Sequence, residues 1–473
     1  MLRKKECSSV EILNDVTKRI KAVDDKIGAY ITLNENALEQ AKAADRAISK
    51  GGNISLLTGI PIAVKDNIST KGLRTTCASK ILENYIPPYN ATVIDKLANA
   101  GAVIIGKTNM DEFAMGSSTE NSYMHLTRNP HNTQYVPGGS SGGSSAAVTS
   151  GEAIIALGSD TGGSVRQPSA FCGSVGFKPT YGTVSRFGLI AYASSFDQIG
   201  TIGKNVKDTA LLYSAVCGYD KMDSTSKLRE YPDFLLSLRD NITGLKIGIP
   251  SEYFGDEIDS EVKEAVYNAI KLLETNGAEV REISLPSTKY VVNAYYIIAS
   301  AEASSNLARF DGVKYGYRAE KYENLSEMYE KTRSEGFGDE VKRRIMLGTF
   351  VLSSGYYDAY YKKAKLMQKR ITAEMSNAFE ECDVIITPTA PTTAYKIGEK
   401  IYNPLKMYAE DMCTVTANLA GIPAISVPCG KDRNGLPIGM QIMANKFREQ
   451  LLFDTAYTYE KICGGFDVIC RNI

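Results

Sequence analysis

Residues 137–148 read PGGSSGGSSAAV, and residues 158–182 read GSDTGGSVRQPSAFCGSVGFKPTYG. Most of the first stretch is Gly and Ser, a composition that is typical of a flexible linker. An alternating apolar stretch nevertheless follows it directly and leads into the second glycine cluster. The two stretches are therefore either a flexible linker between two domains or an ordered backbone that holds a ligand.

Length and composition leave room for a large enzyme. The chain has 473 residues, of which 43% are hydrophobic, enough for a substantial core. A rule of about 150 residues per domain would give roughly three domains, although large single α/β enzymes often depart from it. The 54 Lys and Arg residues balance the 54 Asp and Glu residues, so no basic excess points to direct binding of nucleic acid.

Cysteine and histidine usage argues against metal and disulfide chemistry. The nine cysteines are odd in number, scattered and without a C-x-x-C motif, which predicts reduced thiols in the cytoplasm. The only two histidines, His125 and His131, are not spaced as a helical pair, so we expect loop residues and no metal site. No apolar run approaches a membrane span, and the first residues lack the apolar region of a signal peptide.

Helical and strand patterns alternate along most of the chain. Ser8 and Glu11 form a possible capping box at the start of a helix over residues 8–24. Further helices are expected over residues 35–49, 91–101, 141–152, 260–275 and 447–462. Strands are expected over residues 59–66, 102–108, 153–160, 245–250, 278–286, 383–388, 423–428 and 439–444. This alternation predicts an α/β fold in which helices cover both faces of a large sheet.

Strand patterns disappear between residues 287 and 375. This region is charged, rich in Tyr and helical in its pattern. We therefore expect a helical cap or arm attached to the α/β core.

The pentapeptide GGSSG at 138–142 fits G-x-S-x-G, the nucleophile elbow of α/β-hydrolases, with Ser140 as the nucleophile. Those enzymes need a histidine after the serine, and none follows His131. The sequence therefore excludes this class, apart from a rearranged order that would use His125 or His131. A serine nucleophile without histidine needs a different base.

Lys65 is a candidate for that base. It lies in GIPIAVKDNI, at the end of an apolar segment, and burial lowers the pKa of a lysine because it disfavours the charged form. The alternative is that Lys65 forms an ion pair with Asp66 or another carboxylate.

The second glycine cluster suits a developing negative charge. Thr161, Gly162, Gly163 and Ser164 can direct successive backbone N–H groups into one concavity, as in an oxyanion hole. A tight turn without a ligand and a phosphate loop are the alternatives, although G-x-x-x-x-G-K-[ST] is absent.

Together, Lys65, residues 138–144 and residues 158–182 resemble the amidase signature family, over more than forty near-continuous residues. The resemblance implies the amidase-signature fold, a large mixed sheet with helices on both faces and a helical cap. It implies a single domain over residues 1–473. Within it, the helical N-terminal segment is expected at about 1–50, the signature core at about 55–210 and the cap at about 287–375.

The resemblance also implies a Ser–Ser–Lys triad. Ser164 would be the nucleophile, Ser140 the bridging serine and Lys65 the base, with the oxyanion hole at residues 161–164. In the family a cis peptide bond precedes the bridging serine. Arg166 and Asp160, which flank the nucleophile, are expected to support the loop.

Residues 109–122, 327–361 and 411–430 resemble a narrower family, the A subunits of glutamyl-tRNA(Gln) amidotransferases. Their amide donor is free glutamine, a zwitterion that needs a cation for its carboxylate and an anion for its amine. Arg344 and Asp411 match the family's glutamine-binding residues.

Tyr295 and Met115 match weaker pocket positions of this family. The residues alone leave alternatives open, because Arg344 adjoins other basic residues and could be a surface charge. Asp411 precedes an apolar run and could be a helix N-cap.

This resemblance implies a heterotrimer with B and C subunits and no cofactor or metal in this chain. The B subunit would hold ATP, Mg²⁺ and the charged tRNA, and the ammonia made here would convert Glu-tRNA(Gln) to Gln-tRNA(Gln). One alternative is a stand-alone amidase for other small carboxamides, which would have no reason to pair Arg344 with Asp411. The other is a non-catalytic scaffold, which predicts a broken triad.

Overall fold

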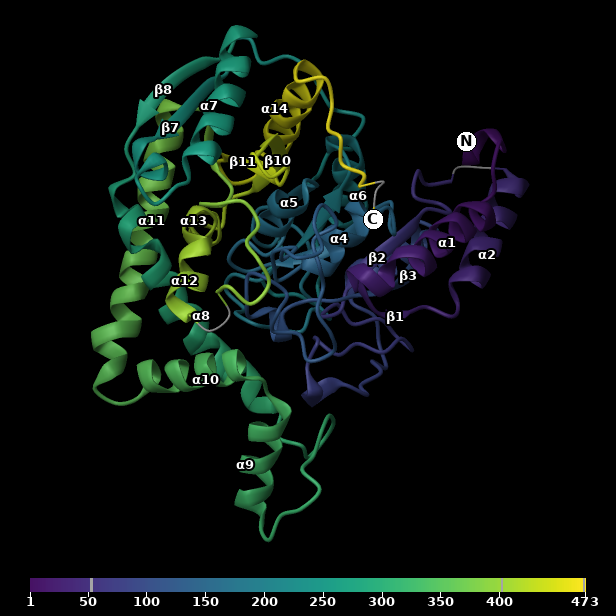
Figure 1. Ribbon diagram of the computed structural model, residues 1–473, viewed down its shortest axis with the longest axis vertical. Coiled ribbons are helices and arrows are strands. Elements are labelled where there is room, and N and C mark those ends of the chain that lie inside the picture. Colours follow the sequence, from purple (N-terminus) through teal and green to yellow (C-terminus); the bar gives the residue numbers. More distant parts are fainter. Residues whose placement is uncertain (52–53, 401–402, 471–472) are drawn as a thin grey trace.

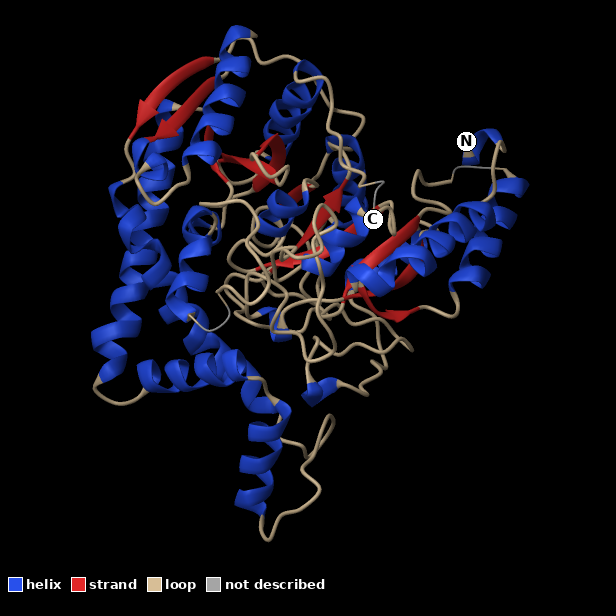
Figure 2. Ribbon diagram, viewed as in Figure 1, coloured by secondary structure: helices blue, strands red, loops and turns tan. Residues whose placement is uncertain are grey.

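The strands of the computed structural model join into one sheet that runs through the centre of the molecule (Figures 1 and 2). The structure describes residues 1–51, 54–400, 403–470 and 473. The strands are β1 (Tyr30–Leu33), β2 (Pro61–Lys65), β3 (Val103–Thr108), β4 (Ile155–Asp160), β5 (Val175–Lys178), β6 (Gln198–Gly203), β7 (Lys246–Pro250), β8 (Glu279–Ile283), β9 (Val384–Pro388), β10 (Ala424–Lys431) and β11 (Pro437–Ala444).

The order across this sheet is β1-β3-β2-β4-β6-β5-β10-β11-β9-β7-β8. Strand β2 is parallel to both of its neighbours, β3 and β4. The strands from β4 through β6, β5, β10 and β11 to β9 pair antiparallel. The sheet is therefore mixed, as predicted.

The helices are α1 (Ser9–Ile27), α2 (Ala37–Lys50), α3 (Thr92–Asn99), α4 (Gly142–Thr149), α5 (Arg166–Cys172), α6 (Val206–Val216), α7 (Ser260–Thr275), α8 (Val291–Asn306), α9 (Leu325–Gly336), α10 (Asp339–Leu352), α11 (Lys362–Glu381), α12 (Pro404–Ala409), α13 (Val415–Ala420) and α14 (Glu449–Ile462). Helices α1, α2, α3, α4, α7 and α14 begin and end close to the predicted positions, and α8 to α11 occupy the region where a helical cap was expected. Helices α5, α6, α12 and α13 were not predicted. The predicted capping box of Ser8 and Glu11 is present at the start of α1.

Helices cover both faces of the sheet. The evidence is that side chains of successive strand residues point to opposite faces and pack in different hydrophobic clusters. Ile62 and Val64 of β2 pack in a cluster with residues of α3, α6, α7 and α14. Ala63, between them, packs on the opposite face with residues of α1 and α4. The predicted α/β fold with two covered faces is confirmed.

The predicted cap is helical, and in the described part of residues 287–375 the structure contains no strand. It comprises α8, α9, α10, a π-helical turn η7 (Tyr357–Tyr361) and most of α11. Helix α10 packs mainly along α8, and α9 projects from the body at the lower end of Figure 1. Among the described residues, no helix is both long enough and apolar enough to cross a membrane.

One local prediction needs correction. The N-terminal segment of residues 1–50 is not helical throughout, because it contains strand β1, which forms one edge of the sheet. Of the two alternatives for residues 137–148, the structure excludes the flexible linker, since these residues lie buried next to the sheet and α4 begins at Gly142.

Candidate active site

Lys65 is the last residue of β2, an inner strand of the sheet, and its side chain is fully buried. Its Nζ donates hydrogen bonds to Ser140 Oγ at 2.7 Å and to the carbonyl oxygen of Ser159 at 3.2 Å. The alternative ion pair with Asp66 is absent from the described contacts, because Asp66 lies instead 3.8 Å from Nζ of Lys107. Burial lowers the pKa of Lys65 to about 7, although nearby carboxylates oppose the shift. A large fraction of this amine is therefore neutral near pH 7.

Ser140 precedes α4, and the peptide bond between Gly139 and Ser140 is cis, as the resemblance implies. The N–H of Asp111 donates to the carbonyl oxygen of Ser140 at 3.3 Å. A Cβ at Gly139 would lie only 2.1 Å from Oδ2 of Asp111, so this position accepts only glycine. The Asp111 carboxylate is held in turn by the N–H of Thr119. The glycines thus allow the backbone to pack tightly around the serine.

Ser164 lies in the loop between β4 and α5. It is 7% exposed, whereas Lys65 and Ser140 are fully buried, so Ser164 is the one of the three that a substrate can reach. Its carbonyl oxygen accepts a hydrogen bond of 3.0 Å from the N–H of Ser141. This bond joins the two serine loops, and in the part of the chain that the structure describes the Ser164 hydroxyl makes no hydrogen bond.

The predicted oxyanion loop is only partly available to a ligand. The N–H of Gly163 donates to Oδ1 of Asp160 at 2.9 Å, so it is removed from the predicted set of donors. The N–H groups of Thr161, Gly162 and Ser164 make no hydrogen bond to the other described residues. These three groups remain candidates for an oxyanion hole.

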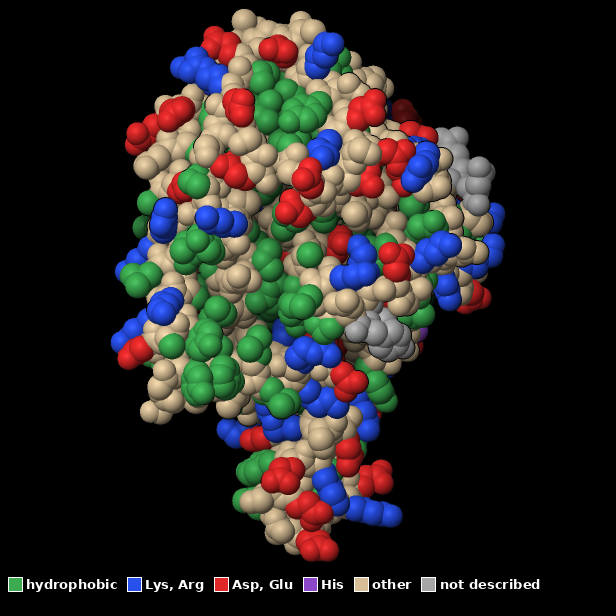
Figure 3. Space-filling model, turned by 60° about the vertical axis from the view of Figure 1, so that its left-hand side comes forward, with side chains coloured by type: hydrophobic (Ala, Val, Ile, Leu, Met, Phe, Trp, Pro, Cys, Tyr) green, Lys and Arg blue, Asp and Glu red, His purple; other side chains and the backbone are tan. Residues whose placement is uncertain are grey.

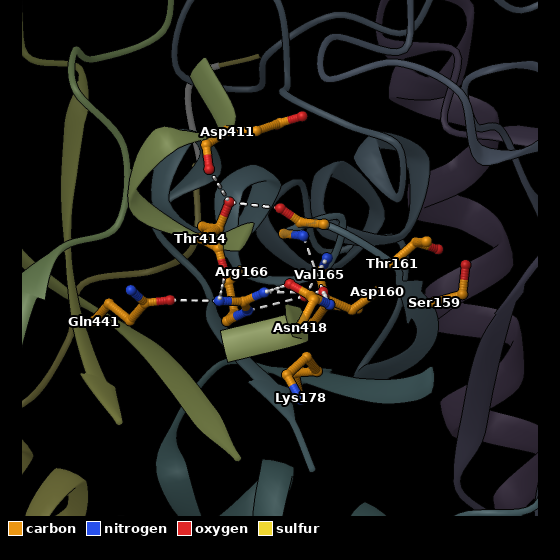
Figure 4. Close-up of polar contacts among 12 residues, drawn as sticks. Ser159, Asp160, Thr161, Val165, Arg166, Lys178, Asp411, Thr414, Asn418 and Gln441 are labelled. Atoms are coloured by element: carbon orange, nitrogen blue, oxygen red, sulfur yellow. Dashed lines mark hydrogen bonds and ion pairs between the residues drawn. The ribbon is translucent and has the colours of Figure 1, made fainter. Parts of the chain in front are cut away.

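A buried guanidinium holds this loop (Figure 4). Arg166 forms a bidentate pair with Asp160, through Nε and Nη2, at 3.0 Å each. Burial alone would raise the pKa of Asp160, but the charge of Arg166 outweighs burial and holds it well below its usual range. Thr414 adds a second attachment, because its Oγ1 donates to the carbonyl oxygen of Gly162 at 2.6 Å. Arg166 and Asp160 thus support the loop, as expected.

Tyr295 contacts the loop of Ser164, and Met115 belongs to the same hydrophobic cluster as Tyr295. A Cβ at Gly162 would be 2.5 Å from the Tyr295 hydroxyl oxygen, so the tyrosine ring packs directly against the glycine. Met115 is fully buried and belongs to the same hydrophobic cluster as Tyr295 and Tyr296.

Arg344 is not a surface charge, since it lies on the inner side of α10 with only 2% of its surface exposed. Its Nε donates to Glu340 Oε1 and its Nη1 to the Tyr192 hydroxyl, both at 2.7 Å. The guanidinium carbon also lies 5.1–5.4 Å from the ring centres of Tyr192, Tyr296 and Tyr408. The three rings thus contact the cation, and three of its N–H donors have no hydrogen-bond partner among the described residues.

Asp411 is not a helix N-cap, because it lies inside the short 3₁₀ turn η8 (Glu410–Cys413) and its carboxylate points elsewhere. Its Oδ2 accepts a hydrogen bond of 2.6 Å from the Tyr296 hydroxyl. Burial raises the pKa of Asp411 to about 7, against the lowering effects of Tyr296 and Arg344. A bound cation would complete this site by favouring the ionised carboxylate.

Two stacked tyrosines connect the acidic and the basic side of the pocket. The rings of Tyr296 and Tyr408 lie 4.0 Å apart at an angle of 26°. Tyr296 binds Asp411, while the Tyr408 hydroxyl donates to Oε1 of Glu340 at 2.9 Å. Arg344 and Asp411, 67 positions apart in the sequence, are therefore connected by hydrogen bonds and one pair of stacked rings.

Several members of this site were not predicted from the sequence. They are Tyr192, Tyr296, Glu340, Tyr408 and Thr414, together with Asp197, whose Oδ1 accepts a hydrogen bond of 2.6 Å from the Thr161 hydroxyl. Of these, only Glu340 could have been predicted from the sequence. It precedes Arg344 by four positions, the spacing of an ion pair on one face of a helix. The two histidines contact backbone carbonyl groups of loops, and the described residues contain no cluster that could hold a metal ion.

The chain is similar to known proteins over almost its whole length. The family model described as Amidase matches residues 11–453. Two relatives, each named as the A subunit of a glutamyl-tRNA(Gln) amidotransferase, are 58% identical to the chain and cover 98% of it. One, from Caldanaerobacter subterraneus subsp. tengcongensis, is covered over 94% of its own length, and the other, from Halothermothrix orenii, over 95%.

A crystal structure of the A subunit of glutamyl-tRNA(Gln) amidotransferase from Thermotoga maritima is 44% identical and superposes with a TM-score of 0.79. The superposition covers 98% of this chain and 95% of that one. The predicted family and its fold are thereby confirmed, and the chain belongs to the amidase family.

Proposed function

We propose that this chain is the A subunit, the glutaminase, of a glutamyl-tRNA(Gln) amidotransferase. Relatives of that name share 58% of their residues with it over almost the whole chain, which supports the proposal. The observation that carries the proposal is the pocket itself. A buried cation, Arg344, and a buried acid, Asp411, lie in one aromatic assembly beside the loop of Ser164.

Free glutamine has complementary charges. Its α-carboxylate would accept hydrogen bonds from the free N–H donors of Arg344, and its α-ammonium group would pair with Asp411. Tyr295 and Met115 would line the path of the glutamine side chain, since Tyr295 packs against Gly162. The carboxamide would then reach Ser164.

The contact between Lys65 and Ser140 supports a proton path from the nucleophile. Neutral Lys65 takes the hydroxyl proton of Ser140, Ser140 takes that of Ser164, and the Ser164 oxygen attacks the carboxamide carbon. The N–H groups of Thr161, Gly162 and Ser164 would stabilise the oxyanion of the tetrahedral intermediate. Ammonia leaves with the proton that returns along the same path, and a glutamyl ester remains on Ser164.

Water hydrolyses this ester by the same route. The water molecule gives a proton to the path that leads to Lys65, and its oxygen attacks the ester carbon. Glutamate leaves when the proton returns to the Ser164 oxygen. Each turnover thus converts glutamine and water into glutamate and ammonia, and no metal or cofactor in this chain takes part in the proposal.

Partner subunits complete the proposed reaction. A B subunit would hold ATP, Mg²⁺ and Glu-tRNA(Gln) and use the ammonia to form Gln-tRNA(Gln), and a small C subunit would bridge the two. We place this heterotrimer in the cytoplasm, in line with the nine free cysteines of the chain.

The test is co-purification with the B and C subunits, followed by assays of glutamine hydrolysis and of glutamine-dependent amidation of charged tRNA. Ser164→Ala should abolish both activities in a folded protein, and substantial residual glutaminase activity would refute the nucleophile assignment. Lys65→Ala should be nearly as severe. Arg344→Ala should mainly raise KM for glutamine, and a change in kcat alone would show that Arg344 does not hold the substrate carboxylate.

The rival of a stand-alone amidase predicts a different outcome. Without partners, it would release ammonia from butyramide, which lacks both charged groups of glutamine, as fast as from glutamine. A chain that binds glutamine through Arg344 and Asp411 should prefer glutamine strongly.

A further inference from the structure

Two residues outside the triad, Asp197 and Thr414, each contact the oxyanion loop, residues 161–164, and one of the two charged sides of the pocket. Asp197 directly precedes β6, and Thr414 lies between η8 and α13. Figure 3 shows acidic and basic side chains interspersed over the surface, whereas both of these residues lie inside the molecule. Neither of them takes part in the proton path from Ser164 to Lys65.

Asp197 connects the oxyanion loop to the side of the pocket that holds Arg344. Its Oδ1 accepts a hydrogen bond of 2.6 Å from the Thr161 hydroxyl and one of 3.1 Å from the N–H of Ala193. Its Oδ2 accepts a bond of 2.9 Å from the N–H of Tyr192, whose hydroxyl accepts a bond from Arg344. One carboxylate thus fixes both a residue with a candidate oxyanion donor and the tyrosine that Arg344 contacts.

The register of the sheet explains why Asp197 and Thr161 meet. Strands β4 and β6 pair antiparallel, and Asp160, the last residue of β4, lies opposite Gln198, the first residue of β6. The residues that follow β4 and precede β6 therefore face each other at the same end of the two strands. Rigid elements thus hold this contact in place.

Thr414 connects the oxyanion loop to Asp411 (Figure 4). Its Oγ1 donates to the carbonyl oxygen of Gly162 at 2.6 Å and lies 3.1 Å from the carbonyl oxygen of Asp411, which also accepts a bond of 3.0 Å from the Thr414 N–H. The carbonyl oxygen of Thr414 accepts a bond of 2.9 Å from Arg166. Thr414 therefore fixes the backbone of Asp411 relative to the oxyanion loop.

These two connections matter for the rate. The loss of one oxyanion donor typically slows acyl transfer by about 100-fold or more, so the loop has to be held in one position. The charged groups of glutamine lie away from its carboxamide, and their binding raises kcat only when it improves the position of the reacting groups. Asp197 and Thr414 provide hydrogen bonds that reach from the charged sites to the loop.

We propose that Asp197 and Thr414 are positioning residues that make oxyanion stabilisation depend on the two charged groups of glutamine. Asp197 connects the loop to the α-carboxylate through Tyr192 and Arg344. Thr414 connects it to the α-ammonium group through Asp411. This inference rests on the proposed function and extends it, because the loop would then select the substrate as well as stabilise the intermediate.

The test separates the two charged groups with two analogues of glutamine. Glutaramate keeps the carboxylate and lacks the ammonium group, and γ-aminobutyramide keeps the ammonium group and lacks the carboxylate. Ammonia release is measured with the full chain assembled with its partner subunits. The assays are run at pH 8, above the pKa of about 7 to which burial lowers that of Lys65, so that the amine is largely neutral.

Asp197→Asn keeps the size of the side chain but turns one acceptor oxygen into a donor, and all three groups around it are donors. It should lower kcat/KM for glutaramate at least about tenfold, and at least about threefold more than for γ-aminobutyramide. Thr161→Val breaks the same bond from the other side, so it should show the same preference and replaces Asp197→Asn if that variant does not fold.

Thr414→Val should show the opposite preference, with the larger loss for γ-aminobutyramide. Thr414→Ser keeps the hydroxyl and should recover most of the rate that Thr414→Val loses. A residue that only supports the fold would lower kcat/KM for both analogues by the same factor.

Matched controls remove similar groups elsewhere. Glu152→Gln also turns a buried carboxyl group into an amide, and Glu152 precedes β4, at the other end of that strand from Thr161. Thr209→Val removes a buried hydroxyl on α6. Both should leave kcat/KM for both analogues within about twofold.

A double-mutant cycle measures the connection through Tyr192 with glutamine itself. Tyr192→Phe removes the hydroxyl that Arg344 binds. It should lower kcat/KM less in the Asp197→Asn background than in the unaltered chain, with a difference of at least about threefold.

Equal losses for both analogues in Asp197→Asn and in Thr414→Val would overturn the inference, and so would additive effects in the cycle. If glutamine is strongly preferred over butyramide while these losses are equal, the proposed function stands and the positioning role is wrong. If the unaltered assembly releases ammonia from butyramide as fast as from glutamine, the proposed function is wrong and the inference fails with it.

Discussion

The rate of glutamine hydrolysis should fall in acid, and kcat and kcat/KM should fall with different slopes. The buried groups Lys65 and Asp411 determine these slopes. Lys65 must be neutral to act as the base, and burial lowers its pKa to about 7. The neutral fraction falls from about one half at pH 7 to about one hundredth at pH 5. At saturating glutamine, kcat should follow this fraction, so its logarithm should fall by about one per pH unit below pH 7.

In the free enzyme, Asp411 must also be ionised before glutamine can bind. Its carboxylate must be ionised to pair with the ammonium group of glutamine, and burial raises its pKa to about 7. Both groups therefore have to lose a proton before productive binding, and both requirements favour higher pH. Below pH 7 the logarithm of kcat/KM should fall by about two per pH unit, so that at pH 5 it reaches about one ten-thousandth of its plateau. Bound glutamine holds Asp411 ionised, which keeps its titration out of kcat.

The measurement is glutamate formation between pH 5 and pH 9 at constant ionic strength. Asp411→Asn should reduce the slope of kcat/KM from about two to about one and leave the slope of kcat unchanged. Glu112→Gln is the matched control, since burial also raises the pKa of Glu112 to about 7 and its carboxylate binds Ser79 and Gly338 outside the pocket. A kcat that is constant from pH 5 to pH 8 would refute Lys65 as the base. An unchanged slope in Asp411→Asn would refute the role of Asp411.

Three further substitutions test the scaffold of the site. Gly162→Ala puts a Cβ 2.5 Å from the Tyr295 hydroxyl oxygen, so we expect kcat to fall at least tenfold with little change in unfolding, and an unaffected kcat would contradict this. Arg166→Met leaves the buried carboxylate of Asp160 unpaired and should lower the free energy of unfolding by about 3–5 kcal/mol in urea titrations, where a negligible loss would be the contrary result. Gly348→Ala places a Cβ 1.9 Å from a backbone oxygen of α8. It should lower the free energy of unfolding by about 1–3 kcal/mol in the same titration and raise KM for glutamine, and no change in either quantity would contradict the tight packing of α10 on α8.

The sequence predicts the parts of the fold that have a clear local period. The helix expected over residues 260–275 is α7, with the same bounds. Strands β1, β5 and β6 were not predicted. Strand β1 is a four-residue edge strand, and β6, QIGTIG, contains two glycines, which weaken any local strand preference. Their pairing comes from partners far away in the sequence, which a local pattern does not contain.

The candidate site was likewise predicted only in part. The family resemblance implied that Lys65 and Ser140 act together, and in the structure Lys65 Nζ lies 2.7 Å from Ser140 Oγ. The surroundings of Arg344 were not predicted, because Tyr192 and Tyr408 reach it from segments that lie more than sixty positions away on either side. The free glycine N–H was not predicted either, although the contact that decides it is local: the carboxylate of Asp160, three residues before Gly163, accepts the hydrogen bond of the Gly163 N–H.

Arg166 and Arg344 are both buried but differ in the number of hydrogen bonds that their guanidinium groups make. Arg166 and Arg344 are both almost completely buried, and each lies against a carboxylate. Arg166 makes five hydrogen bonds, to Asp160 twice and to Thr414, Asn418 and Gln441, which matches the five N–H donors of a guanidinium. Arg344 makes two such bonds in the described part of the chain. The remaining N–H groups of Arg344 are therefore available to bind an anion, which the carboxylate of glutamine would supply, whereas Arg166 has no donor left for a ligand.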